Sequence, residues 1–219
     1  MKIARISRAA AAALALGVAA AGFASVPEAQ AQQGFSGKSA GDIMVRARMI
    51  GAIPDEDASV TVIGGNVSVD NDWVPEVDFT WFVTDNIALE LIAATTRHDV
   101  SSSVVGSLGK VSLLPPTLTL QYHFMPKERF SPYVGAGLNY TFFYKEDAPG
   151  GIVTSIDYEN SVGYALQAGL DYALNDNWYA NIDVKKIFLS TDVSINGGAI
   201  TADVDLDPWI VGFGVGYKF

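Results

Sequence analysis

The sequence contains no cysteine. This absence excludes a framework of disulfide bonds, and it also excludes a metal site built from thiolate ligands. Beyond residue 31 the chain also lacks any run of about 18 apolar residues, the length that a membrane-spanning helix requires. The remainder of the chain must therefore be held together, and placed in the cell, by other means.

Positive charge is scarce in this chain. Lysine and arginine together number 14, against 24 aspartates and glutamates, and the formal net charge is −10. Proteins that bind nucleic acid need a basic surface to meet the phosphates, so we expect no nucleic-acid partner. The 21 glycines form no phosphate-binding fingerprint, because no helical pattern follows them. We expect no cofactor and no bound metal.

The first 31 residues have the composition of an export signal. Lys2, Arg5 and Arg8 give a positive start, an alanine-rich apolar run follows, and residues 29–31 are Ala-Gln-Ala, the small-residue pattern of a cleavage site. The apolar run is too short for a spanning helix. We predict that residues 1–31 are a cleaved signal peptide and that residues 32–219 form a single domain.

After this leader, apolar side chains alternate with small or polar ones in eight segments, and no segment has a helical period. Alternation with a period of two is typical of β-strands, because successive side chains point to opposite faces. A tilted strand of about 9–11 residues crosses a hydrocarbon layer, and these segments reach that length. The predicted strands are residues 42–53, 74–84, 87–95, 113–125, 132–144, 161–174, 178–190 and 203–219.

Alternation alone fits both a soluble β-sandwich and a membrane barrel, because both place apolar residues on one face of each strand. The lengths of the connections favour the barrel. Tight turns are predicted at residues 84–86, 126–131 and 175–177, and long polar loops at 54–72, 95–112, 145–160 and 190–202. Short turns at one rim and long loops at the other are typical of outer-membrane barrels.

Aromatic residues gather near the ends of the predicted strands, as in the interfacial girdles of membrane barrels. The members near the turns are Tyr122, Phe124, Phe130, Tyr133, Trp178, Tyr217 and Phe219, and those near the loops are Trp73, Tyr144, Phe188 and Trp209. We therefore predict an all-β, eight-stranded antiparallel barrel of the bacterial outer membrane, with short periplasmic turns and long extracellular loops.

Several segments, in order, resemble the outer-membrane protein W (OmpW) family across the chain that follows the leader. They are AGDIMVRA (40–47), TDNIALELIAAT (84–95), LLPPTLTLQYHF (113–124), SPYVGAGLNYTFF (131–143) and LDPWIVGFGVGYKF (206–219). The resemblance implies an eight-stranded outer-membrane barrel with a hydrophobic passage for small apolar molecules. It also implies that barrel-assembly machinery recognises the C-terminal Phe219.

The predicted inward faces of the strands divide into two zones. Toward the short turns lie charged and polar residues, which we expect to pair and to close the narrow lumen as a plug, since an unpaired buried charge is costly. The predicted plug consists of Arg46, Arg48, Asp78, Glu90, Gln121, His123, Asp171, Asp183 and Lys185. Toward the long loops the inward residues are apolar and predict a funnel that binds apolar solutes, with Ile50, Ile92, Phe143, Ile187, Leu189 and Ile210 among its walls.

A plugged lumen needs another exit, and Pro115 and Pro116 suggest one. Proline has no N–H to donate, so the strand cannot complete its ladder at this point. We predict a lateral gate there, through which an apolar solute leaves into the membrane. The alternative is that the two prolines only begin the strand above the membrane.

Several polar features have a second interpretation. His98, Asp99 and Ser101 lie together in sequence, but adjacent loop residues seldom form a catalytic triad, so we expect no enzyme. His123 fits either a proton-sensitive switch or a satisfied interior histidine. Acidic clusters at 54–59, 70–72 and 203–207 fit either a solvated rim or Ca²⁺ binding. Lys186 has the parity of the lipid-facing side, and a lysine there is tolerated only near an interface.

Two functions fit these expectations. The first is a passive outer-membrane passage for small hydrophobic solutes, whose partners are membrane lipid, lipopolysaccharide, the solutes and the assembly machinery. The second is a structural barrel with a filled lumen, whose loops serve adhesion or attachment of phage or bacteriocins. Nothing in the sequence determines the oligomeric state.

Overall fold

The computed structural model describes residues 35–219 apart from 55–56, 61–66, 103–105 and 152. The predicted signal peptide lies outside the described residues. None of the described segments forms a helix that is long and apolar enough to cross a membrane.

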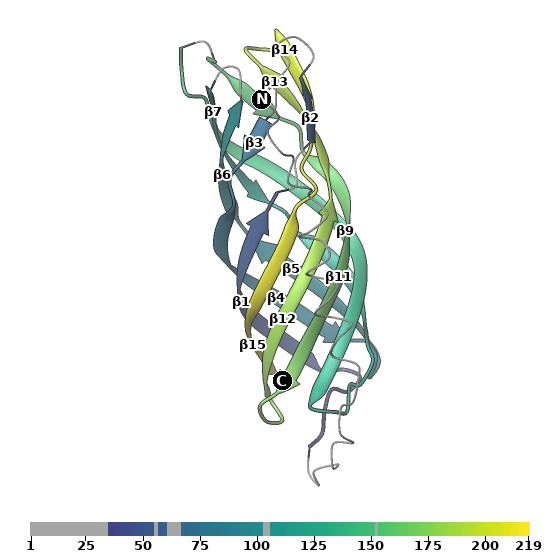
Figure 1. Cartoon of the computed structure of the whole chain (residues 1–219). Helices are drawn as coiled ribbons and strands as arrows, with labels where there is room; N and C mark the ends of the chain where they lie inside the picture. Colours follow the sequence, from purple (N-terminus) through teal and green to yellow (C-terminus); the bar gives the residue numbers. More distant parts are fainter. Residues whose placement is uncertain (1–34, 55–56, 61–66, 103–105, 152) are drawn as a thin grey trace, which may run out of the picture. The chain divides into compact units, whose positions relative to one another are not determined.

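Eight strands form a closed antiparallel barrel, which confirms the predicted fold class. Each strand pairs with the next one in chain order, and the last returns to pair with the first. Figure 1 shows the strands side by side, with the C-terminus at the end opposite β13 and β14. The barrel strands are β1 (Ile43–Ile53), β4 (Asp72–Phe82), β5 (Ile87–Ala94), β8 (Thr117–His123), β9 (Phe130–Asp147), β11 (Ser161–Ala173), β12 (Trp178–Phe188) and β15 (Trp209–Lys218).

The apolar face of each barrel strand points outward. Leu118, Leu166 and Phe213 are 51%, 52% and 55% exposed, so they do not pack together in a central core. The alternate residues of the same strands are buried and include charged groups such as Arg46, Asp78 and Asp183. An outer surface of large apolar side chains around a polar interior is the arrangement that a barrel adopts in lipid.

The predicted long loops contain further strands, and here the sequence prediction was incomplete. β10 (Ile156–Tyr158), β13 (Ser190–Ile195), β14 (Ile200–Asp205) and β2 (Asp57–Val60) form a second sheet in the order β10-β13-β14-β2. β6 (Thr96–Ser102) pairs with β7 (Gly106–Leu114) and with β3 (Val67–Val69), and β7 also pairs with β9.

The last predicted strand, 203–219, was wrong at its start. Residues up to Asp205 belong to β14, and the barrel strand β15 begins at Trp209. Short strands in these loops were missed because their apolar positions are few and stand among Ser, Thr, Asp and Gly. The alternating burial of Thr191, Val193 and Ile195 is nevertheless visible in the sequence as a period of two.

Tyr133 is not a member of the aromatic girdle near the turns, contrary to the prediction. It is 1% exposed and points into the barrel, since it alternates with the outward residues of β9 such as Val134. Gly169 provides the space: a Cβ at this position would stand 2.3 Å from Cζ of Tyr133. The strand parity therefore decides the direction of this ring, although the residue lies near a turn.

Candidate functional site

The end of the lumen near the short turns is filled by a network of buried ion pairs, which we call the polar base. Arg46 is at its centre, with Nε 2.9 Å from Asp78 and Nη2 2.9 Å from Glu90. Nη1 of Arg46 also lies 3.3 Å from Asp171. The polar base comprises Lys38, Arg46, Arg48, Glu76, Asp78, Glu90, Gln121, His123, Tyr133, Gln167, Asp171, Asn181, Asp183 and Lys185.

The second arginine of β1 extends this network one layer toward the long loops. Nε of Arg48 donates to Glu76 at 2.7 Å, and its Nη2 lies 3.1 Å from Asp78. Because residues two apart on a strand share a face, Arg46 and Arg48 interact with Glu76 and Asp78 across the β1–β4 ladder, where the two pairs are in register. Glu76 was not among the predicted plug residues, although its parity matches that of Asp78.

Neutral polar side chains connect the remaining carboxylates. Nε2 of Gln167 donates to Glu90 at 2.9 Å and to Asp183 at 2.8 Å. The hydroxyl of Tyr133 also donates to Asp183 at 2.8 Å, and Lys185 forms an ion pair with the same carboxylate. The nine predicted plug residues are thus all buried in one connected network, together with several that sequence reasoning missed.

Lys38 is the most unexpected member, because it precedes the first strand. It belongs to residues 35–40, which we call the N-terminal strap. Its side chain is fully buried, and Nζ lies 2.7 Å from Asp171, 2.9 Å from Ser131 and 3.1 Å from His123. Burial lowers the pKa of the Lys38 ammonium from its ordinary value, and the neighbouring Asp171 acts in the opposite direction.

The strap is fixed to the turns at the base of the barrel. The backbone N–H of Lys38 donates to Pro126 at 2.7 Å, and that of Ser36 to Asp176 at 3.1 Å. Gly37 has φ +67°, and a Cβ there would stand 2.6 Å from Cα of Lys127, so only glycine fits this close approach without strain. The N–H of Ala40 donates to Asp85 at 2.9 Å, and this bond, followed by that from Lys127, lowers the pKa of Asp85.

Above the polar base the inward side chains are apolar and surround a cavity of about 110 Å³. Its walls come from the barrel strands and from the strands that extend beyond them. All six residues predicted for the funnel line it: Ile50, Ile92, Phe143, Ile187, Leu189 and Ile210.

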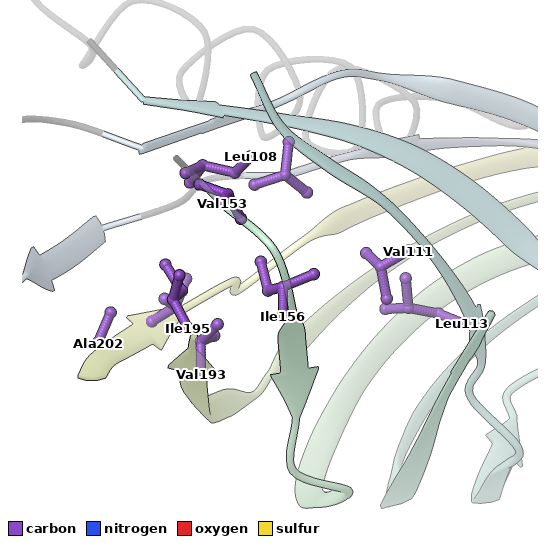
Figure 2. Close-up of a cluster of buried hydrophobic side chains, with 10 residues drawn as sticks. Leu108, Val111, Leu113, Val153, Ile156, Val193, Ile195 and Ala202 are labelled. Carbon is purple, nitrogen blue, oxygen red and sulfur yellow. The ribbon is translucent and has the colours of Figure 1, made fainter. Parts of the chain in front are cut away.

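The outer part of the cavity is lined by side chains that sequence reasoning missed. Val193 and Ile195 of β13 and Ile156 of β10 face this space, together with Leu108 and Val111 of β7 (Figure 2). They pack against one another in one buried cluster. The second sheet therefore continues the apolar wall of the barrel instead of forming polar loops over it.

Two charged residues of the polar base form the boundary with the cavity. Lys185 and Glu76 both line the cavity. Each is neutralised by the base, Lys185 by Asp183 and Glu76 by Arg48. The lumen thus changes from ionic to apolar at about the level of these two side chains.

The prolines interrupt the wall beside this boundary. The ladder between β5 and β8 ends at Ile92–Thr117, and that between β6 and β7 begins at Thr96–Leu113. Residues 93–95 and 114–116, all of which the structure describes, make no ladder pairs with each other. On the other side of the prolines, the N–H of Tyr140 donates to the carbonyl of Pro116 at 3.1 Å.

The two prolines face different sides of the wall. Pro115 lines the inner cavity. Pro116 lines a groove on the outer surface with Leu91, Leu118, Leu138, Asn139, Tyr140 and Val162. They lie between β7, which ends at Leu114, and β8, which begins at Thr117. The seam between β5 and β8 therefore has an apolar surface on both sides of a gap in the backbone pairing.

The side chains of His98 and Asp99, neighbours in sequence at the long-loop end, point to opposite sides of β6. His98 is buried at the cavity, with Nδ1 2.8 Å from the carbonyl of Asp70. Asp99 points the other way and pairs with Lys110 at 2.8 Å on the surface. Within the described residues, no three His, Asp or Glu side chains are grouped to hold a metal ion.

Lys186 lies at the end of its pairing with β15, opposite Trp209. Its ammonium is 5.2 Å from the centre of the Trp209 ring and donates to the carbonyl of Asp207. This arrangement is expected near a membrane interface, where the methylene groups of a lysine lie along apolar surface and its ammonium group reaches the aromatic residues at the membrane edge.

Comparison with known proteins gives a consistent assignment. The model of the OmpW family matches residues 39–219. The chain is 41% identical to the uncharacterised outer-membrane protein y4mB of Sinorhizobium fredii, over 94% of this chain and 91% of that protein. It is 37% identical to outer membrane protein W of Escherichia coli, over 82% and 89% of the two chains.

Among solved structures, the outer membrane protein OprG of Pseudomonas aeruginosa is similar, with a TM-score of 0.80 and 33% sequence identity. The match covers 84% of this chain and 99% of that one. It supports both the eight-stranded barrel and its place in the outer membrane.

Proposed function

This chain belongs to the OmpW family of outer-membrane β-barrels, and from that membership we propose that it is a passive passage for small apolar molecules. In this proposal a solute enters at the extracellular end, binds in the apolar cavity and leaves sideways into the membrane. The passage needs neither a cofactor nor a source of energy.

The observation that carries this proposal is the apolar cavity in the upper lumen. Its walls are mostly aliphatic or aromatic, and its volume of about 110 Å³ is of the order of an apolar protein cavity that accepts benzene, about 150 Å³. Transfer of an apolar solute from water to such walls is favourable by roughly 25 cal/mol per Å² of buried surface. The cavity therefore fits a small hydrocarbon or aromatic compound.

The polar base supports the view that the solute does not continue along the barrel axis. A solute moving through this zone must separate buried ion pairs such as Arg46–Asp78 and Arg48–Glu76. Leaving one such charge unpaired costs about 3–5 kcal/mol. In the proposal these residues act as a plug toward the periplasm.

The seam at Pro115 and Pro116 is the proposed lateral gate. It lies between the cavity and an outer apolar groove, and it lacks the backbone ladder that closes the wall elsewhere. A solute crossing here separates side chains but breaks no ladder between residues 93–95 and 114–116. Thr117 and Asn139, whose side chains are hydrogen-bonded at 2.9 Å, lie just below the gate and give it a polar lower edge.

The alternative function, a filled barrel that presents its loops for surface attachment, needs a lumen that is packed along its whole length. The cavity lined by Ile92, Phe143 and Leu189 favours the passage over that alternative. We also propose that membrane lipid and lipopolysaccharide are partners of the barrel, and that the assembly machinery recognises Phe219, which is 70% exposed.

Two alanines of the barrel provide a test of the passage. Ala94 of β5 lines the cavity, whereas Ala168 of β11 points outward, is exposed and lies opposite Val134 and Val184, away from the cavity and the seam. In a strain that lacks this gene, uptake of a radiolabelled aromatic hydrocarbon is measured after expression of each variant at equal barrel level. We expect Ala94→Trp to reduce uptake at least tenfold, because the indole fills the cavity, and Ala168→Trp to leave it near the original rate. Equal uptake by both variants would reject the passage.

The same uptake measurement tests the lateral gate with a separate variant. Pro115→Thr combined with Pro116→Val restores N–H donors to the strand, and we expect it to slow uptake severalfold while solute binding in the cavity is retained. Pro132→Val is the matched control, because Pro132 lies at the turn end of β9, opposite Leu170 and away from the seam. Undiminished uptake by the double variant would remove the gate and leave the cavity proposal standing.

A further inference from the structure

The base of the barrel holds one nitrogen atom among three acceptors from three different strands or turns. Nζ of Lys38 is surrounded by Asp171 Oδ2 of β11 at 2.7 Å, Ser131 Oγ of β9 at 2.9 Å and His123 Nδ1 of β8 at 3.1 Å. The other ring nitrogen of His123 lies 3.1 Å from Oε1 of Gln121. With Nε2–H donating to Gln121, the lone pair of Nδ1 faces Lys38. Three acceptors match the three donors of a primary ammonium.

Two aromatic rings complete the surroundings of this nitrogen. The centre of the Phe82 ring is 5.7 Å from Nζ, and that of the Tyr179 ring is 5.6 Å away. Both distances are within the range of cation–π attraction. Both rings are fully buried, in one cluster with Met44, Ala88 and Ala173.

The side chains of Asp171, His123 and Phe82 have contacts in the barrel besides those with Lys38. Asp171 is also bound by Asn181 Nδ2 at 2.7 Å and by Arg46 at 3.3 Å. His123 packs on Phe82 with ring centres 5.0 Å apart and on Tyr133 at 4.9 Å. The walls of the site therefore come from the barrel, and only the ammonium comes from the strap.

We infer that the base of the barrel contains a binding site for a primary alkylammonium ion, formed by Asp171, Ser131, His123, Phe82 and Tyr179. Lys38 is the tethered occupant of this site, and it seals the periplasmic end by filling it. When the strap leaves, the site accepts the ammonium group of another molecule from the periplasmic side. This inference does not rest on the passage of apolar solutes.

The attachment of the strap is compatible with such an exchange. Several of its bonds are at the surface, including those from Ser36 to Asp176 and from Ala40 to Asp85, where water competes for the same groups. The buried part of the attachment consists of the side chain of Lys38, its backbone bond to Pro126 and the bond that Nζ of Lys218 donates to the carbonyl of Gly37. The occupant is thus a single side chain on a short segment that precedes the barrel.

The test is chemical rescue of Lys38→Ala by n-propylammonium, which has the carbon and nitrogen atoms that this substitution removes. The variant of the full chain is purified from outer membranes, and thermal unfolding is followed by its heat-dependent shift on gels. We expect Lys38→Ala to unfold roughly 5–10 °C below the original protein. Propylammonium restores about half of this shift or more in the variant, and it has no such effect on the original protein.

Two controls separate binding in the site from a general effect of salt. Tetramethylammonium has the same charge but no N–H donors, so it should not rescue Lys38→Ala. Lys38→Met fills the same space with an apolar chain of similar length, so it should be destabilised and should not respond to propylammonium. A rescue by tetramethylammonium that equals that by propylammonium, or no rescue by either, would overturn the inference.

Ion conductance gives a second readout. In planar bilayers we expect Lys38→Ala to pass small ions at a rate severalfold above the original protein, and propylammonium added on the periplasmic side to reduce this current. If Lys38→Ala does not assemble in cells, its refolding yield with and without propylammonium in lipid vesicles decides the question. A yield that does not depend on the amine would count against the site.

Discussion

The two halves of the lumen are built by the same faces of the same strands, yet their chemistry is opposite. On β1 the inward residues are Arg46 and Arg48 toward the periplasm, and Ile50 and Ala52 toward the outside. On β12, Lys185 is followed two positions later by Ile187. The height along a strand, and not the strand itself, therefore decides whether the lumen is ionic or apolar.

The difference also explains why one half is filled and the other is hollow. Buried charges must be paired, and a shared partner such as Arg46 brings carboxylates of three strands into contact within the lumen. Apolar walls have no such requirement, so they can leave a cavity where the barrel is wide enough. The polar base closes itself for electrostatic reasons, and the apolar half remains available for a solute.

The largest effect is expected from removing the central cation of the polar base. Arg46→Met keeps the volume but leaves Asp78, Glu90 and Asp171 without their shared partner. We expect the free energy of unfolding to fall by about 3–5 kcal/mol, measured by urea titration of the barrel in lipid vesicles. Arg97→Met is the control, because the Arg97–Asp147 pair is half-exposed and such pairs contribute about 0–1 kcal/mol. Similar losses in the two variants would contradict the distinction between base and surface.

A smaller effect is expected in the apolar half. Ile187→Ala shortens a buried side chain that lines the cavity. We expect the free energy of unfolding to fall by about 1–3 kcal/mol. This loss is below the usual range for a fully packed core residue, because one side of Ile187 already faces the cavity. The enlarged cavity should also favour bulkier solutes in uptake assays. Ile182→Ala on the same strand faces outward, toward lipid, and is 57% exposed, so it should leave the preference among solutes unchanged. If Ile187→Ala lowered the free energy of unfolding as much as Arg46→Met does, the proposed difference between the two halves of the lumen would be wrong.

The smallest effect is expected outside the barrel, where water surrounds the charges. The pKa of Asp85 is lowered by the bond from Ala40 and by Lys127. Its contribution to stability is therefore present above the ordinary aspartate pKa of about 3.9 and is lost as the pH falls through the lowered value. Asp85→Asn should unfold at a slightly lower temperature than the original protein at pH 7. That difference should disappear in strongly acidic buffer, and a difference that is constant with pH would show that the carboxylate charge has no part in it.

The barrel fold and most of the residues that line the lumen could be predicted from the sequence, because both follow from a local rule. Parity along each strand fixes which residues share a face, and it correctly grouped Arg46 with Arg48 and Ile50 with the apolar wall. The same rule, applied further, would have included Glu76 and turned Tyr133 inward. These two omissions came from incomplete use of the pattern and not from missing information.

Lys38 and the apolar face of the second sheet are different, because no local pattern in the sequence shows which residues they contact. Lys38 stands in a segment without alternation, and its place beside Asp171 depends on how the strap crosses the turns. Val193 and Ile195 alternate in the sequence, but the sequence does not tell which space they face. Their contribution to the cavity depends on the pairing of β13 with β10 and β14.

The sequence by itself determined that this protein is a barrel with apolar residues outside, a charged zone near the turns and an apolar zone near the loops, because alternation and composition act over a few neighbouring residues. Only the tertiary structure decided which charges meet, where the wall lacks its ladder and what fills the base. Those features join residues far apart in the chain, such as Lys38 with Asp171, and their contact depends on the closure and stagger of the whole barrel.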